Sequence, residues 1–239
     1  MHNLIWLFRE ARTGSGWALQ SLSSSLNKTV VHYDLVLGNR NVKEETYFEL
    51  YNQKNLLSTE KRFEELIKQE TVFDTDRIYS SHFMFLLSKL NNQNTYVLRT
   101  TRRNKIDQCV SLLYLKYYPR IMKQYFVDES KNLNLNYFNH TINNPVEVSK
   151  KDVIDCLSLM KTHDDLWKKY SGNFKNYTIV YEDCEQGINV PNLDVQLKFS
   201  NFTGFTKKIP EYKTKVFTNY DMIVSWCEEF IDKNPFIIV

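Results

Sequence analysis

The chain has 239 residues, of which 42% are hydrophobic and 14% aromatic, and its formal net charge is +3. This length and apolar content suffice to bury a core and exclude an intrinsically disordered chain. A net charge this small gives no support for a nucleic-acid or anionic-membrane partner, and we expect no nucleic-acid partner.

The N-terminal part of the chain alternates short apolar runs with helical patterns. Residues 4–8 form an apolar run typical of a buried strand, and residues 29–33 form a β-branched run that predicts a second strand. Between them, leucines recur at helical spacing and predict a helix over residues 17–26. A further helix is predicted over residues 59–69, with Thr59 placed to cap it.

The middle of the chain continues this alternation. Residues 77–81 and 95–99 are predicted strands, and apolar residues at helical spacing predict a helix over residues 105–118. Residues 119–148 are the least regular part and are rich in Asn and Tyr. They are interpreted either as a lid or acceptor-binding insertion or as a plain surface loop.

The C-terminal part adds two helices and a strand. Ser149 and Asp152 resemble a capping box that opens a long helix, which we expect Gly172 to close. Residues 177–181 are a predicted strand, and residues 221–231 form the last predicted helix. Alternation of this kind predicts an α/β fold of three layers, in which helices flank a central parallel sheet within a single domain over residues 1–239.

The cysteines bear on the redox compartment and on metal binding. They are Cys109, Cys156, Cys184 and Cys227, and no two of them form a C-x-x-C motif. We therefore expect reduced, mostly buried thiols and no metal site. No basic leader with a cleavage site opens the chain, and no apolar run is long enough to span a bilayer, so a cytoplasmic protein without a transmembrane segment is expected.

Residues 10–17, which read EARTGSGW, directly follow the first predicted strand. A glycine-containing turn between a strand and a helix N-terminus can bind an anion through its backbone N–H groups and the helix dipole. A Walker A loop would continue with Gly-Lys-Ser/Thr, whereas here Gly16 is followed by Trp17. Arg12 instead precedes the glycines and carries a guanidinium group suited to phosphate or sulfate oxygens.

A second candidate group follows the predicted strand at residues 95–99. Arg103 and Ser111 are eight residues apart, across the start of the next predicted helix. Both side chains could face one ligand phosphate, since guanidinium and hydroxyl donors suit a dianion. The alternative is a solvated basic turn followed by a buried helix serine.

Separated segments of the chain together resemble the PAPS-dependent sulfotransferases, where PAPS is 3′-phosphoadenosine 5′-phosphosulfate. Residues 12–17 (RTGSGW) are similar, position by position, to the Lys-Ser-Gly-Thr-Thr-Trp loop of the cytosolic members. Residues 101–112 (TRRNKIDQCVSL) look most like the bacterial trehalose and nodulation-type members. Residues 181–183 (YED) follow a late strand, as in the family. The resemblance implies a P-loop NTPase-like fold.

The resemblance also implies roles for individual residues. The 5′-phosphosulfate would be held by Arg12, Thr13, Gly14, Ser15 and Gly16, and Arg12 would stabilise charge on the leaving phosphate. Trp17 would pack on the adenine, with Tyr181 nearby. Arg103 and Ser111 would bind the 3′-phosphate, which distinguishes PAPS from ATP. No metal is implied, and the product is 3′-phosphoadenosine 5′-phosphate (PAP).

The acceptor hydroxyl needs a base, and two assignments stay open. Residues 77–87 (RIYSSHFMFLL) resemble the Lys-Thr-His-Leu-Pro segment of the family, which puts His82 on its catalytic histidine. In the bacterial glycolipid branch the base is a glutamate after strand two, and Glu44 and Glu45 are the candidates for that role. Near the C-terminus, Lys213 or Lys215 would supply a further phosphate contact, and the alternative is that both are solvated surface lysines.

Three functions therefore compete. The first is transfer of a sulfuryl group from PAPS to a hydroxyl of a carbohydrate, a glycolipid or a small molecule. The second is a P-loop nucleotide kinase or related phosphotransferase, which the missing Gly-Lys-Ser/Thr disfavours. The third is a module that binds PAPS without catalysis. The acceptor and the oligomeric state are left open.

Overall fold

The computed structural model describes residues 4–10, 15–26, 29–32, 71–75, 95–118, 143–198 and 213–237. The chain divides into two compact units, each made of two stretches of sequence. The first unit comprises Met1–Thr101 and Trp167–Asn201, and the second comprises Arg102–Leu166 and Phe202–Val239. The prediction of one domain over the whole chain is not tested by this division and stays a prediction. Only the last part of the predicted insertion, residues 143–148, lies within the described residues.

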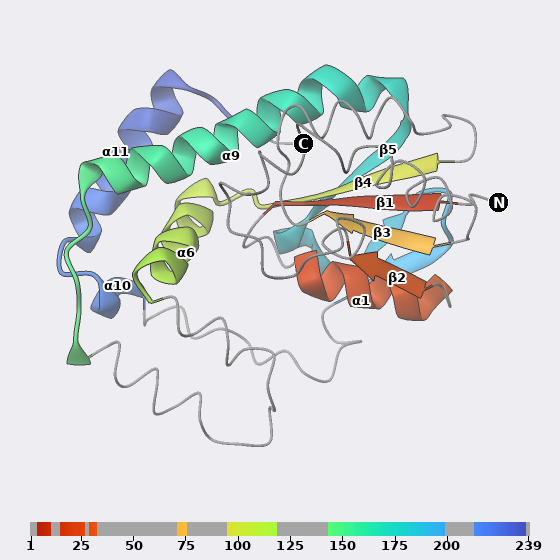
Figure 1. Cartoon of the computed structure of the whole chain (residues 1–239), viewed down its shortest axis with the longest axis horizontal. Coiled ribbons are helices and arrows are strands. Elements are labelled where there is room, and N and C mark those ends of the chain that lie inside the picture. The colour runs from red at the N-terminus through yellow and green to blue at the C-terminus, as the bar shows by residue number, and fades with distance from the viewer. Residues whose placement is uncertain are drawn as a thin grey trace, which may run out of the picture. The chain divides into compact units, whose positions relative to one another are not determined.

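Five parallel strands form the sheet of the first unit, in the order β2-β3-β1-β4-β5 (Figure 1). They are β1 (Leu4–Arg9), β2 (Thr29–His32), β3 (Thr71–Thr75), β4 (Thr95–Thr101) and β5 (Lys175–Val180). Helical segments connect β1 to β2 and β4 to β5, as parallel strands require. The prediction of an α/β fold with a parallel sheet is confirmed.

Most strand predictions agree with the structure to within two residues. No pattern in the sequence singled out β3 or the two short strands near residue 190. The strand predicted at residues 77–81 and the helix predicted at residues 59–69 lie outside the described residues.

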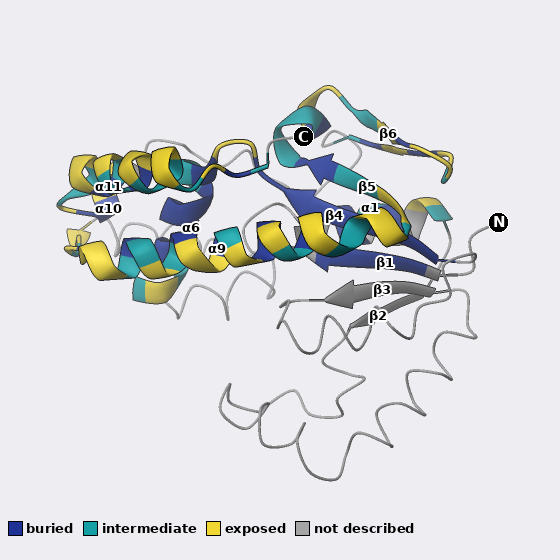
Figure 2. Cartoon of the chain, turned by 90° about the horizontal axis from the view of Figure 1, so that it is seen from above, coloured by how far each residue is buried: buried dark blue, intermediate teal, exposed yellow. Residues whose placement is uncertain are grey.

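The two central strands explain the apolar run at the start of the chain. Residues 5–8 of β1 and all residues of β4 are buried (Figure 2). A strand that is buried on both faces favours a continuous apolar run such as that of β1 over strict alternation of apolar and polar residues.

Helix α1 (Ser15–Leu26) joins β1 to β2 and packs against β2, β3 and β7 (Val195–Leu197). It begins two residues before the predicted start, so Gly16 lies within its first turn. Leu19 and Leu22 are buried, as the helical spacing of the leucines predicts.

Two short elements follow β5. The 3₁₀-helix η2 (Tyr181–Glu185) begins where the predicted strand would have ended. Strands β6 (Ile188–Val190) and β7 then pair antiparallel. In the turn between them, Asn192 and Asp194 have φ angles of 63° and 53°, a left-handed conformation that these two residue types tolerate best.

The second unit contains several helices, and the sequence predicts all but one of them to within two residues at each end. They are α6 (Lys105–Tyr117), most of α9 (Lys150–Tyr170), α10 (Lys213–Val216) and α11 (Tyr220–Lys233), of which only α10 was not predicted. Buried and exposed residues alternate along α9 at helical spacing (Figure 2). Apolar stripes of these helices share one core, whose fully buried members include Val110, Leu113, Val153, Leu157 and Ile223.

Both ends of α9 lie close to the residues that the sequence predicts for them. At the start, the Ser149 hydroxyl accepts a hydrogen bond from Asp152 N at 3.1 Å, as a helix cap does. At the end, Gly172 was expected to close the helix, and α9 ends at Tyr170, two residues before it. Gly172 lies in a 3₁₀ turn, η1 (Ser171–Asn173), closed by a hydrogen bond from Phe174 N to Ser171 O at 3.1 Å.

Replacing Ser149 with alanine is expected to lower the free energy of unfolding by about 1 kcal/mol, because an N–H of the first turn of α9 loses its acceptor. Urea unfolding followed by circular dichroism measures this loss. Ser158→Ala, at an exposed position within the same helix, is the matched control and should leave stability unchanged or slightly higher. Equal losses in the two variants would contradict the cap.

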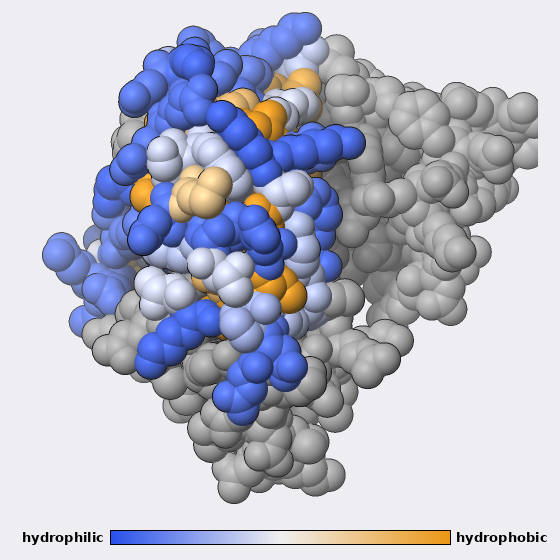
Figure 3. Space-filling view, turned by 90° about the vertical axis from the view of Figure 1, so that its left-hand side faces the viewer, coloured by the Kyte–Doolittle hydropathy of each residue, from blue (hydrophilic) through white to orange (hydrophobic). Residues whose placement is uncertain are grey.

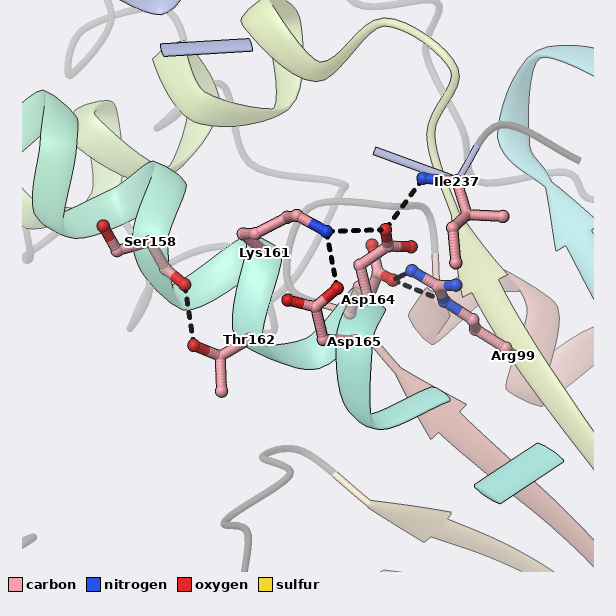
Figure 4. Close-up of polar contacts among 8 residues, drawn as sticks. Arg99, Ser158, Lys161, Thr162, Asp164, Asp165 and Ile237 are labelled. Carbon is pink, nitrogen blue, oxygen red and sulfur yellow. Dashed lines mark hydrogen bonds and ion pairs between the residues drawn. The ribbon is translucent and has the colours of Figure 1, made fainter. Parts of the chain in front are cut away.

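The last described residues are held against α6 and α9. Ile237 N donates to Asp164 Oδ2 at 2.8 Å, and Lys161 Nζ lies 4.0 Å from the same oxygen (Figure 4). The ammonium of Lys105 lies 5.3 Å from the centroid of the Phe236 ring. Asp164 is fully buried, so its carboxylate secures this segment from inside the unit.

The surface drawn in Figure 3 is largely hydrophilic, with small apolar areas between polar side chains. Among the described residues, the large hydrophobic side chains that are more than half exposed are Leu159 (52%) and Met222 (51%). They lie on different helices, α9 and α11. Scattered apolar side chains of this kind are ordinary for a protein surface.

Candidate functional site

The carboxyl ends of β1 and β4 define the candidate site. The two strands are neighbours and end at the same edge, since Arg9 pairs with Thr100. From β1 the chain turns toward β2 on one side of the sheet, and from β4 it turns toward β5 on the other. In open α/β sheets, ligands bind outside the carboxyl ends of strands where the strand order reverses in this way.

A buried polar cluster joins these two strand ends. Glu10 and Arg99 are each 1% exposed, and Arg99 Nε donates to Glu10 Oε1 at 2.5 Å while Arg99 Nη2 completes the ion pair. Figure 4 shows the Arg99 guanidinium in these contacts. Thr101 Oγ1 donates to Glu10 Oε2 at 3.1 Å. Both carboxylate oxygens of the first residue after β1 are therefore fastened to β4.

Aromatic rings enclose this cluster. The guanidinium carbon of Arg99 lies 5.8 Å from the centroid of the Trp167 ring, and the ring of Phe8 lies 5.9 Å from Trp167. A cation over an indole face is attracted to it, and the attraction is stronger where water is excluded. Glu10 is thus sealed from solvent, and we assign it to positioning the start of the loop rather than to contact with a ligand.

The predicted phosphate loop begins directly after Glu10. Arg12, Thr13 and Gly14 lie outside the described residues. Ser15, Gly16 and Trp17 are the first three residues of α1, whose opening backbone N–H groups have no acceptor within the helix. The loop thus joins a fixed residue, Glu10, to a helix N-terminus of the kind that binds anions.

Arg103 and Ser111 both lie beyond β4, in different environments. Arg103 is exposed and precedes α6, and Ser111 lies within α6 and is 0% exposed. The start of α6 is capped by Asn104, whose Oδ1 accepts from Asp107 N at 2.9 Å. Arg102 Nη2 lies 3.7 Å from Asp107 Oδ2. The turn is ordered, Arg103 is accessible, and the Ser111 hydroxyl is enclosed by protein.

Tyr181 lies at the same edge of the sheet as the end of β4. Val180 pairs with Thr101, so Tyr181 is the first residue beyond β5 at that edge. It opens η2 and is partly buried. Burial, and then the charges of Asp183 and Glu182, raise the pKa of the neighbouring Cys184 thiol to about 12.

The remaining predicted residues are not brought together by the described structure. His82, Glu44 and Glu45 lie outside the described residues. Lys213 is the first residue of α10, and Lys215, in the same short helix, is exposed. The choice of base and the lysine contacts stay predictions.

Known proteins add no assignment to this geometry. The sequence matches no protein-family model, and no curated protein matches it.

Two further findings concern metals and membranes. Within the residues that the structure describes, no group of three or more His, Cys, Asp or Glu residues is arranged to hold a metal ion. None of the helices in these ranges combines the length and the apolar character needed to cross a bilayer.

Glu10 opens the segment EARTGSGW and Arg99 closes the segment TYVLR, but the motifs assign a role to neither residue. A sequence signal exists, because each is a charged residue at the end of an apolar strand, in LIWLFRE and TYVLR. The signal is local and does not pair them, since they are 89 residues apart.

Proposed function

We propose that the chain is a PAPS-dependent sulfotransferase with a P-loop NTPase-like fold, which transfers a sulfuryl group to a hydroxyl of a carbohydrate, a glycolipid or a small molecule. The observation that carries the proposal is the order of the sheet. The segments with the family's motifs leave three adjacent parallel strands, β1, β4 and β5, at one edge. That edge is where ligands of such sheets bind.

The donor would be held by residues with distinct tasks. Arg12 and the N–H groups at the start of α1 bind the 5′-phosphosulfate, and Trp17 and Tyr181 pack near the adenine. Arg103, which is exposed, pairs with the 3′-phosphate. Ser111 is fully buried, so its hydroxyl meets that phosphate only after the residues that cover it move. Arg103 therefore carries most of the discrimination between PAPS and ATP.

The reaction is an in-line transfer. The acceptor oxygen attacks sulfur, the bond between sulfur and the 5′-phosphate oxygen breaks, and PAP leaves. The acceptor proton passes to His82 or to a glutamate, Glu44 or Glu45. Negative charge grows on the leaving 5′-phosphate, and Arg12 together with backbone N–H groups stabilises it.

Ligand-dependent thermal stability tests donor binding. PAP at about 100 times its Kd should raise the free energy of unfolding by about 2.7 kcal/mol without magnesium, and ATP should raise it less. If ATP with magnesium stabilises the protein and PAP does not, the proposed sulfotransferase function is wrong and a kinase function is favoured. If PAP stabilises the protein but no labelled sulfate is transferred from PAPS to glycans or lipids, the protein is a module that binds PAPS without catalysis.

The Arg103→Ala variant sharpens this test. We expect this substitution to weaken the binding of PAP by about 1.5–3 kcal/mol, which is the usual cost of losing a hydrogen bond to a charged group. The binding of adenosine 5′-phosphosulfate should be almost unchanged, because that nucleotide has no 3′-phosphate. Lys151→Ala removes an exposed positive charge from α9 and is the matched control. Equal losses for both nucleotides would contradict the role of Arg103.

A further inference from the structure

Three cysteines from three helices meet in the core of the second unit. Cys109 lies on α6, Cys156 on α9 and Cys227 on α11. Cys109 Sγ lies 4.0 Å from the carbonyl oxygen of Val153, one helical turn before Cys156. Cys109 and Cys227 belong to one buried core cluster, and Cys156 packs against that cluster. The sequence, in which these residues are far apart, does not indicate this cluster.

The three thiols differ in exposure. Cys109 and Cys227 are fully buried, whereas Cys156 is partly exposed. None of these three cysteines is joined in a disulfide. Cys156 is therefore the thiol of this cluster that a small oxidant can reach.

Charged groups beside Cys156 add to this difference. Asp152 lies one turn before Cys156 on α9, and its Oδ1 pairs with Lys116 Nζ at 2.5 Å. The hydrogen bond from Cys109, and then the positive charge of Lys116, lower the pKa of Cys156, while burial and the carboxylates of Asp152 and Asp155 oppose this shift. The hydrogen bonds with Cys156 and Cys227, and then burial, raise the pKa of Cys109. The thiolate of the pair thus forms on the accessible sulfur, and the proton stays on the buried one.

We propose that Cys156 is a peroxide-sensitive thiol and that Cys109 is its resolving partner, so that oxidation joins α9 to α6 through a disulfide. Reactive cysteines lie in partly exposed, electropositive surroundings, often beside a second cysteine that completes the disulfide. Cys156, Lys116 and Cys109 supply these three features. The proposal does not depend on the sulfotransferase function.

The chemistry balances with hydrogen peroxide as the oxidant. The Cys156 thiolate attacks one peroxide oxygen, the O–O bond breaks, and a sulfenic acid forms while hydroxide leaves and takes up a proton. The Cys109 sulfur then attacks the Cys156 sulfur as its own proton is lost, the S–O bond breaks, and water leaves. Two thiols lose two electrons in total, and one peroxide is reduced to two waters.

The experiment treats the full chain with hydrogen peroxide and maps the products by peptide mass spectrometry, with dimedone as a trap for sulfenic acid. We expect a Cys109–Cys156 disulfide, and we expect Cys156 to be modified at least about 10-fold faster than Cys184. Cys184 is the internal control, because it is fully buried and burial raises its pKa to about 12. Modification of Cys184 as fast as Cys156, or a peroxide-treated chain without this disulfide, overturns the proposal.

Variants separate the roles of the cysteines. In Cys109→Ala, dimedone should trap Cys156, since the sulfenic acid has no resolving thiol beside it. In Cys156→Ala the disulfide should be lost, and in Cys227→Ala it should still form. A disulfide between Cys156 and Cys227 in the unsubstituted chain would overturn the assignment of Cys109. The mapping of the unsubstituted chain decides this even if a core variant folds poorly.

Discussion

Replacing Glu10 with alanine is expected to lower the free energy of unfolding by about 3–5 kcal/mol, because it leaves the buried Arg99 guanidinium without this carboxylate. Both side chains are 1% exposed, and Trp167 covers the guanidinium, so water cannot take the place of the carboxylate. Thr101 also loses the acceptor of its hydroxyl hydrogen bond. A loss of this size is a large part of the stability of an ordinary domain, about 5–15 kcal/mol.

Urea unfolding followed by circular dichroism measures the Glu10 effect against two controls. Asp165→Ala removes a carboxylate that is 58% exposed and lies 2.5 Å from Lys161, and we expect it to cost about 0.3–0.5 kcal/mol. The double variant Glu10→Leu with Arg99→Met should recover much of the Glu10→Ala loss, since an apolar pair needs no desolvation of charge. A Glu10→Ala loss no larger than that of Asp165→Ala would contradict the buried ion pair.

The buried contacts of Glu10 with Arg99 and Thr101 also fix the residue from which the candidate loop begins. Its two carboxylate oxygens hold the end of β1 to Arg99 and Thr101 of β4. The next described residue is Ser15, at the start of α1. The first backbone N–H groups of α1 are placed by the helix itself, and donors that are already placed need no reordering when an anion arrives.

Local patterns predicted the helices of the second unit well. The starts of α6 and α9 depend on Asn104 and Ser149, whose side chains accept hydrogen bonds from the first turn of each helix. Such caps act within a few residues and are visible in the sequence. The core stripes follow from the same local periodicity, as Leu157 and Met160 illustrate.

Features that depend on distant residues were missed. β3 is a short strand with an aspartate, Asp74, and it forms because β1 and β2 lie on its two sides. β6 and β7 have three residues each, too few to show a period. Arg99 can contact Glu10 only when β1 and β4 are paired. Cys109 can approach Cys156 only when α6 packs near α9. Tertiary contacts decide all of these.

The sequence motifs predict which residues belong to the candidate site, but they do not predict which buried residues support it. The turn that contains Arg12 and the turn that contains Arg103 are each contiguous in the sequence, so a resemblance to a family can be read from them directly. The structure adds that the strands before them, β1 and β4, are neighbours and parallel. The buried residues that hold this edge carry no family motif and had to be found in the structure.

If the proposed function is right, replacing Arg12 with alanine is expected to lower kcat for sulfuryl transfer by about 10²–10³-fold, the usual cost of removing one group that stabilises transition-state charge. The affinity for the donor PAPS should fall much less, because the charge on the leaving phosphate is fully developed only as the S–O bond breaks. Arg12→Lys keeps the positive charge and resembles the cytosolic sulfotransferases, so it should retain most of the activity. Single-turnover transfer from labelled PAPS, with Lys151→Ala as the charge control, measures these rates. An Arg12→Ala protein with unchanged kcat would remove Arg12 from the catalytic step, and equal losses in the alanine and lysine variants would show that its charge is not what the reaction uses.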